Sequence, residues 1–484
     1  MLLELKNQQN LNDVDGLILC VEKESKGETK FDAIFSNLKA KGTFEGKIGE
    51  LQTVTLMEND RIIEVAFLGV GDGDSFKLTK FRKGLAEAYK ALKGKKVSKI
   101  AVDLKAVEAV TSVDKRLARS LGDVFIMSDY SFEDYKTDAK PSTVEKVELI
   151  GLELDVEALN EGKLLGEANV FSRHMTNMPA NIMTPEKLAE MARNYCEASG
   201  VEVEIKGESE IEALGMHAYM AVAKASVNPP RLIVMRYKGN PDSDKILGYV
   251  GKGLTYDSGG LSIKPTPSMV NMKDDMGGAS AVIAAMGAIG KLGLKVNVTA
   301  VVAACENMIS GESYKPGDII NSMGGKTIYI GNTDAEGRLT LVDAVTYAQE
   351  HEKVTFVLDI ATLTGAALHC TGSEAAPAIS NDDDFYQLVE KAFHKADEKI
   401  WRMPIFDEYR ELVKNDQADL TNTAGSPGTI TAGIFIGEFV KDVPWVHIDI
   451  AGTAFREKAT GVYSKGGTGS GAIPLVYLAK KMCK

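Results

Sequence analysis

Three charged side chains at alternate positions, Asp334, Glu336 and Arg338, form the segment with the clearest capacity for chemistry. They lie within Asn332–Leu339, after an apolar run at 327–330 that predicts a buried strand and before a helical pattern. If the segment is extended, alternation places all three on one face. Two carboxyl groups this close resist full ionisation unless a cation lies between them, and Arg338 or a metal ion could be that cation. The alternative is a solvated polar turn.

A glycine-rich segment, residues 251–265, offers two lysines and an aspartate: Lys252, Asp257 and Lys264. It follows a predicted strand that ends at Val250. Because glycine lets the backbone approach a ligand closely, we predict an active-site loop here. A flexible surface loop with both lysines in water is the alternative, but the apolar residues between them favour attachment to the core.

Two adjacent acids, Asp274 and Asp275, precede a predicted small-residue helix at 279–289. Taken alone, acids at a helix start are more often simple N-caps. Taken with the other segments, they give four candidate inward carboxylates, which are Asp257, Asp275, Asp334 and Glu336. Two divalent ions would neutralise these groups, and carboxylate oxygens suit Mg²⁺ and Mn²⁺ and are accepted by Zn²⁺. All six histidines lie outside the three segments, which argues against a His-rich zinc protease site.

In all eight residues, Asn332–Leu339 resembles the signature of the leucyl aminopeptidase family, the cytosol aminopeptidases. Residues 251–265, Asp275–Gly278 and 359–365 support the resemblance, which extends over about residues 160 to 484. It implies a site for two metal ions. The implied ligands are Asp257 and Glu336, bridging both ions; Lys252 and Asp275, on the more tightly held ion; and Asp334, on the more exchangeable one.

The resemblance also implies roles for residues that face the substrate. Lys264 and Arg338 would be the catalytic cationic groups, with a bicarbonate ion at Arg338 as a further cofactor. The main-chain carbonyl of Leu363 would bind the substrate amine. An apolar pocket would take the first side chain, and Met272 and Ala451 are our candidates for lining it.

The implied function is that of a metal-dependent aminopeptidase, which is a hydrolase and a protease. It would release N-terminal residues, preferably leucine or other apolar ones, from peptides, using Mn²⁺ or Zn²⁺, with Mg²⁺ as a further candidate. A homohexamer is also implied. A two-metal hydrolase acting on a phosphoester is one alternative, because two metals and a Lys–Arg pair would suit a phosphoryl group. The other is a DNA-binding or assembly factor with incidental peptidase activity.

The alternation of strand and helix patterns along the chain predicts an α/β protein. A chain of 484 residues exceeds one usual hydrophobic core. We predict a smaller N-terminal α/β domain at 1–155, serving oligomer contacts or regulation, and a larger catalytic α/β domain at 156–484 with a mixed central sheet. The predicted strands are 17–21, 63–70, 100–104 and 147–152 in the first domain, in a mostly parallel sheet, and 232–237, 246–250, 296–303, 327–330, 354–360 and 445–450 in the second.

Composition limits the remaining possibilities. The net charge of −12 argues against broad nucleic-acid binding through surface charge. Five scattered cysteines, an odd number without a Cys-x-x-Cys pair, predict reduced thiols in a cytosolic protein. The N-terminal residues do not resemble a signal peptide, and no apolar run approaches the length of a membrane span. We therefore expect a cytoplasmic protein that does not act at a membrane, and peptides as its substrates are what the family resemblance implies.

Overall fold

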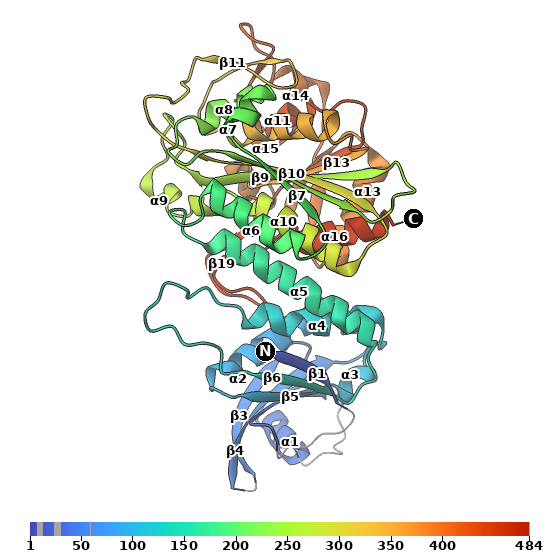
Figure 1. Cartoon of the computed structure of the whole chain (residues 1–484). Helices are drawn as coiled ribbons and strands as arrows, with labels where there is room; N and C mark the ends of the chain where they lie inside the picture. The colour runs from blue at the N-terminus through green and yellow to red at the C-terminus, as the bar shows by residue number, and fades with distance from the viewer. Residues whose placement is uncertain (7–12, 24–30, 59, 484) are drawn as a thin grey trace. The chain divides into compact units, whose positions relative to one another are not determined.

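The computed structural model of this chain describes residues 1–6, 13–23, 31–58 and 60–483 (Figure 1). The chain divides into two compact units, and each alternates helices with strands. Unit 1 comprises Met1–Val170 and Lys458–Lys465, and unit 2 comprises Phe171–Glu457 and Gly466–Lys484. The division along the chain falls inside helix α5, Val156–Asn177. The prediction of a smaller and a larger α/β domain is confirmed.

Unit 1 is built on a six-stranded sheet with the order β1-β6-β5-β2-β4-β3. Every neighbouring pair is parallel except β3 and β4, so the predicted mostly parallel sheet is confirmed. The strands are β1 Leu2–Leu5, β2 Gly16–Glu22, β3 Leu51–Glu58, β4 Arg61–Gly71, β5 Lys99–Asp103 and β6 Lys146–Ile150, and the helices before α5 are α1 Asp32–Ala40, α2 Leu78–Gly94, α3 Lys105–Glu108 and α4 Lys115–Asp129. Phe35 of α1 packs edge-on against Phe44 in one part of the core.

Unit 2 is built on an eight-stranded sheet with the order β15-β14-β17-β13-β9-β10-β8-β7. Strands β10, β9, β13 and β17 run parallel, whereas β7–β8, β8–β10 and β14–β17 are antiparallel pairs. The predicted mixed sheet is therefore confirmed. Its strands are β7 Glu202–Lys206, β8 Arg231–Lys238, β9 Ile246–Asp257, β10 Asn297–Asn307, β13 Phe356–Ala361, β14 Ala376–Ser380, β15 Ile400–Arg402 and β17 Trp445–Asp449.

Helices cover both faces of this sheet (Figure 1). Helices α6 Pro185–Glu197, α10 Gly277–Leu292 and α16 Ala472–Lys481 lie on one face, and α8 His217–Ala223, α11 Gly337–Glu350 and α15 Gly428–Gly437 lie on the other. The remaining elements of unit 2 are α7 Glu208–Ala213, α9 Thr266–Met269, η2 Met272–Asp274, α12 Gly365–Thr371, α13 Asp383–Lys395, α14 Asp407–Glu411, β11 Ile319–Asn321, β12 Thr327–Tyr329, β16 Leu420–Thr421, β18 Phe455–Arg456 and β19 Gly466–Gly467. A sheet covered on both faces leaves its strand ends as the accessible place for a site.

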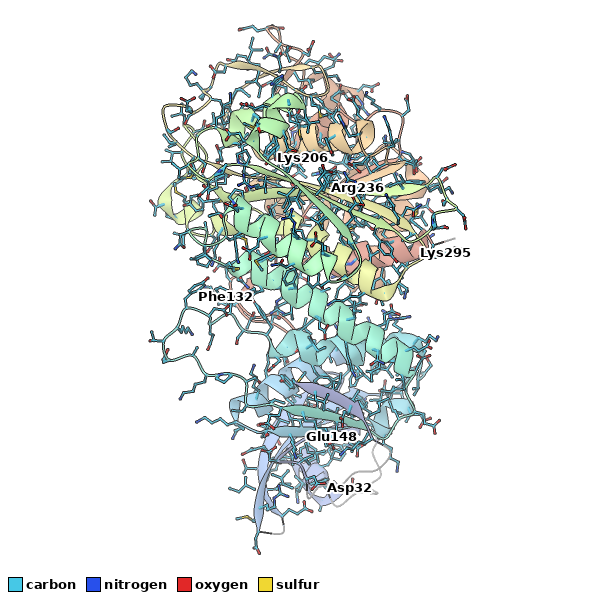
Figure 2. The ribbon with its side chains drawn as sticks, in the orientation of Figure 1. Asp32, Phe132, Glu148, Lys206, Arg236 and Lys295 are labelled. Carbon is cyan, nitrogen blue, oxygen red and sulfur yellow. The ribbon has the colours of Figure 1, made fainter. Side chains whose placement is uncertain are left out.

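Strand β7 is an edge of the large sheet and carries charged side chains. Figure 2 shows Lys206 of β7 and Arg236 of the neighbouring β8 on this part of the sheet. Arg236 lies 2.7 Å from Glu204 and 2.6 Å from Glu352, and Lys206 also pairs with Glu204. Charged groups on an edge strand oppose pairing with a second chain, so this edge is protected from aggregation.

Two local predictions differ from the structure. Residues Gly251–Asp257 belong to strand β9 and are not a loop, because the strand continues past the predicted end at Val250 and remains buried. The short strand β12 is not part of the large sheet and pairs with β11 and β16 in a separate three-stranded sheet. All five cysteines are free thiols, as predicted. In the described part of the chain, every helix is too short or too polar to cross a membrane.

Candidate active site

Strand β9 supplies both Lys252 and Asp257, and a bulge brings them to the same side. The pairing of β9 with β10 shifts from Leu254–Cys305 to Tyr256–Glu306, so β9 contains one extra residue. In a regular strand, residues five positions apart point to opposite faces. The extra residue reverses that relationship, as bulges beside active sites often do. Both side chains are almost completely buried and line the same cavity.

Two ammonium groups contact the four predicted carboxylates, two carboxylates each. Lys252 Nζ lies 2.8 Å from Asp275 Oδ1 and 3.0 Å from Glu336 Oε1. Lys264 Nζ lies 2.9 Å from Asp257 Oδ2 and 2.6 Å from Asp334 Oδ1. The structure therefore brings together all six of these side chains, from three segments far apart in the sequence.

Asp275 does not cap the helix that follows it. Met276 occupies the N-cap position of α10, and no side chain caps that helix end. Asp275 Oδ1 instead accepts hydrogen bonds from Lys252 Nζ at 2.8 Å and from Thr362 Oγ1 at 2.9 Å. The simple capping alternative is thus wrong for this residue.

Asp334 and Glu336 lie between β12 and α11, Arg338 is in the first turn of α11, and all three line the cavity. The segment is a turn and not an extended strand. Ala335 N donates to Asn332 O at 3.3 Å, and Glu336 has helical backbone angles, with φ −82° and ψ −36°. The three side chains reach the same cavity because the backbone curves around it. They therefore lie together as expected, but not through the alternation of an extended strand.

Gly337 allows Lys252 to approach the start of α11. A Cβ atom at position 337 would lie 2.3 Å from Lys252 Cε and 2.6 Å from Nζ. These distances are far shorter than a van der Waals contact, so any larger residue would displace Lys252. Glycine at this position of the segment is a geometric requirement of the site.

Two asparagines that the sequence analysis did not single out hold the site in place. Asn307 Nδ2 donates to Asp257 Oδ1 at 2.8 Å and to Thr333 O at 3.0 Å. Asn422 Nδ2 donates to Asn332 O at 2.7 Å, and the main-chain carbonyl of Asn422 accepts from Arg338 Nη1 at 2.8 Å. Each asparagine stands at or just after the end of a strand, which is the signal that could have identified them.

Arg338 and Leu363 complete the predicted set. Burial lowers the pKa of Arg338 to about 10, although the charges of Glu336 and Asp449 oppose that shift, so the guanidinium stays charged at neutral pH. Leu363 N donates to Asp449 Oδ1 at 3.1 Å, and Thr364 Oγ1 donates to Asp449 Oδ2 at 2.7 Å. Asp449 therefore fixes the loop that carries Leu363 at the cavity.

Burial and close charges perturb the site's acids and lysines. Burial and the charge of Asp257 raise the pKa of Glu336 to about 7, against the opposing effect of the two lysines. Burial also raises the pKa of Asp275 and of Asp334. Burial would lower the pKa of Lys252, but the charges of Asp275, Glu336 and Asp257 outweigh it and raise that pKa. The cluster is thus short of positive charge.

These residues fit divalent metal ions. One carboxylate oxygen from each of Asp257, Asp334 and Glu336 lies within 4.8 Å of the others. Asp275 Oδ2 and Glu336 Oε2 are enclosed yet accept no hydrogen bond from the residues described. Buried carboxylate oxygens without donors are costly unless a cation binds them. Lys252 can join such a set only by losing its proton.

The cavity beside the cluster has a volume of about 510 Å³. Its lining includes the two residues proposed for an apolar pocket, Met272 and Ala451, together with Leu363, Leu368 and Ala454. Asp274 lines it as well. A cavity that combines apolar walls with converging polar groups is the usual form of a small-molecule site, so this cavity is the candidate substrate pocket.

Two family descriptions match the chain. Residues 170–476 match the catalytic domain of the cytosol aminopeptidase family, and residues 19–139 match the N-terminal domain of the same family. A probable cytosol aminopeptidase of Clostridium perfringens is 46% identical over 456 residues, which cover 92% of each chain. Another, of Clostridium tetani, is 46% identical over 469 residues, which cover 96% of each chain.

Two solved structures are similar to this chain over nearly its whole length. A mutant of tomato leucine aminopeptidase has a TM-score of 0.89 at 31% identity and covers 99% of this chain and 96% of its own. The bottromycin maturation enzyme BotP in complex with Mn has a TM-score of 0.88 at 29% identity and covers 97% of this chain and 100% of its own.

Proposed function

The chain belongs to the cytosol aminopeptidase family, and from this premise we propose that it releases leucine and other apolar residues from the N-termini of peptides. It is a hydrolase of the leucyl aminopeptidase type, and its family is metal-dependent. The cluster of four carboxylates, three of them buried, that lines a partly apolar cavity carries the proposal. The apolar wall, including Met272 and Ala451, would take the first side chain.

We assign the two proposed metal sites to five residues. Asp257 and Glu336 would bridge both ions, Lys252 and Asp275 would complete one site, and Asp334 would complete the other. The enclosed, donor-free oxygens of Asp275 and Glu336 support this assignment. Mn²⁺ or Zn²⁺, with Mg²⁺ as a further candidate, would supply Lewis acidity that polarises the scissile carbonyl and acidifies water.

The remaining site residues would act on the substrate directly. Carboxylates raise the pKa of Lys264 against the effect of burial, so it stays an ammonium that can donate a hydrogen bond to the developing oxyanion. Arg338 is the cation proposed to hold bicarbonate. The main-chain carbonyl of Leu363 would accept a hydrogen bond from the substrate's free amine, which would favour removal of the N-terminal residue alone.

Assembly and location are part of the same proposal. We propose a cytoplasmic homohexamer in which the N-terminal unit serves oligomer contacts or regulation. The alternative of a DNA-binding or assembly factor predicts that partner binding survives loss of Glu336. The formal net charge of −12 counts against the DNA-binding form of that alternative.

The test is hydrolysis of leucine-p-nitroanilide after chelator treatment and readdition of Mn²⁺, Zn²⁺ or Mg²⁺, with N-acetyl-leucine-p-nitroanilide beside it. We expect metal-restored cleavage of the free-amine substrate only, and loss of cleavage in Glu336→Gln. Folded protein that cleaves neither substrate with any of the metals, or cleaves both equally, would overturn the proposal.

A further inference from the structure

Asp274 differs from the other carboxylates of the cavity because no described lysine or arginine forms an ion pair with it, although the charges of Lys252, Lys273 and Lys264 act on it from farther away. Four of them, namely Asp257, Asp275, Asp334 and Glu336, lie within 3.0 Å of a lysine ammonium. The Asp274 carboxylate makes no ion pair and accepts no hydrogen bond from any side chain or amide in the described part of the chain, apart from a contact with its own backbone. The Asp274 side chain does not cap helix α10. The capping role considered from sequence therefore does not account for an acid at this position.

The neighbouring lysine is directed elsewhere. Lys273 Nζ donates to Asn177 O at 2.8 Å, which holds it in a different contact. Asp274 lies at the wall of the cavity, whose lining also includes the apolar Met272, Ala451 and Ala454. A carboxylate in such a place is poorly solvated and gains most from a cationic group that enters the cavity.

We propose that Asp274 extends the specificity of this pocket to peptides whose first residue is basic. Lysine and arginine have long apolar stems that can pack along an apolar wall while the charged head binds a carboxylate. The stem would lie against Met272 and its neighbours, and the ammonium or guanidinium head would reach Asp274. This inference rests on the proposed aminopeptidase function and names a substrate class for the same pocket.

The test compares lysine with norleucine, which has the same straight stem without the charge. We would measure kcat/KM for both aminoacyl-7-amido-4-methylcoumarins with the full chain, Asp274→Asn, and the control Asp407→Asn. The control removes an acid that is fully exposed and lies outside the cavity. Removing one partner of a charge pair should lower the lysine-to-norleucine ratio by about tenfold or more in Asp274→Asn only.

Other outcomes overturn the inference in distinguishable ways. An unchanged ratio, or an equal loss on both substrates, would show that Asp274 does not read the side-chain charge. If Asp274→Asn does not fold, the natural chain alone tests the inference. A kcat/KM about 100-fold lower for the lysine substrate than for the norleucine substrate would contradict a site for basic residues. Calorimetric binding of free L-lysine and L-norleucine gives a second readout without turnover, and the variant should weaken only lysine. A natural chain that cleaves neither leucine nor norleucine substrates would instead sink the proposed function.

Discussion

Lys252 Nζ lies 3.0 Å from Oε1 of Glu336, and both side chains are almost completely buried. The lysine carries its proton because three carboxylates raise its pKa against the effect of burial. In the proposed function the same nitrogen binds a metal ion, which requires the neutral amine. Metal binding and protonation therefore compete at one atom, and this competition can be measured.

Metal binding should release protons. At pH 7 we expect about one proton per chain from Lys252, plus a fraction from Glu336, whose pKa is about 7. The measurement is calorimetric titration of chelator-treated protein with Mn²⁺ in two buffers of different ionisation enthalpy. Lys252→Arg keeps the charge but cannot lose its proton, so it should bind the ion far more weakly. Equal affinity and zero proton release would show that Lys252 is not a ligand.

The metal-free protein should lose stability as the pH rises from about 5 to about 7.5. Burial raises the pKa of Glu336 from its ordinary value of 4.5 to about 7, so the folded chain holds a proton in this interval that the unfolded chain releases. Stability from this group is present at low pH and is lost as the pH passes 7. Thermal unfolding in chelator should show a smaller decrease in Tm for Glu336→Gln than for the natural chain. A parallel decrease in both would contradict the assignment.

Asn307→Ala should weaken metal binding and catalysis without removing any proposed ligand. Asn307 Nδ2 fixes Asp257 at 2.8 Å, and loss of a group that orients a ligand usually costs roughly 10- to 100-fold in affinity or activity. Asn297→Ala is a matched control at the other end of β10, where the side chain donates to Asn240 O and Ser243 O. We expect that control to affect stability only. Similar metal affinities for Asn307→Ala and Asn297→Ala would show that Asn307 does not support metal binding.

Gly337→Ala should disable the site by steric displacement. The added methyl group would lie 2.3 Å from Lys252 Cε, so Lys252 must move away from Asp275 and Glu336. Gly311→Ala is the control, because nothing lies within 4 Å of a Cβ there and its backbone needs no glycine. We expect leucine-p-nitroanilide hydrolysis to fall by at least about tenfold in the first variant. Full activity of Gly337→Ala would contradict the described packing.

The residues of the candidate site could be predicted from the sequence, whereas the secondary structure on which they lie could not. The glycines around Lys252 and Asp257 favour a loop, yet Gly251 and Gly253 lie within strand β9. Gly251, for example, allows α10 to pack closely, since a Cβ atom there would lie 2.8 Å from Ala279 Cα. The extra residue in β9 depends on pairing with β10, which no local pattern encodes.

Other parts of the site depend on contacts between distant segments. Asn307 binds Asp257 across 50 positions and Asn422 binds Asn332 across 90, so neither asparagine belongs to a local motif. Alternation would place Asp334, Glu336 and Arg338 on one face if the segment were extended, but hydrogen bonds within it and to Asn422 hold it as a turn. The alternating helices and strands were predictable because they follow from local periodicity.

The number of divalent ions bound per chain tests the central proposal most directly. Chelator-treated protein would be dialysed to equilibrium against Mn²⁺ or Zn²⁺, and the bound metal counted by mass spectrometry for the natural chain and Glu336→Gln. The account predicts two ions in the natural chain, with leucine release restored, and fewer than two in the variant. Leucine release without bound metal, or the same two ions in Glu336→Gln, would contradict it.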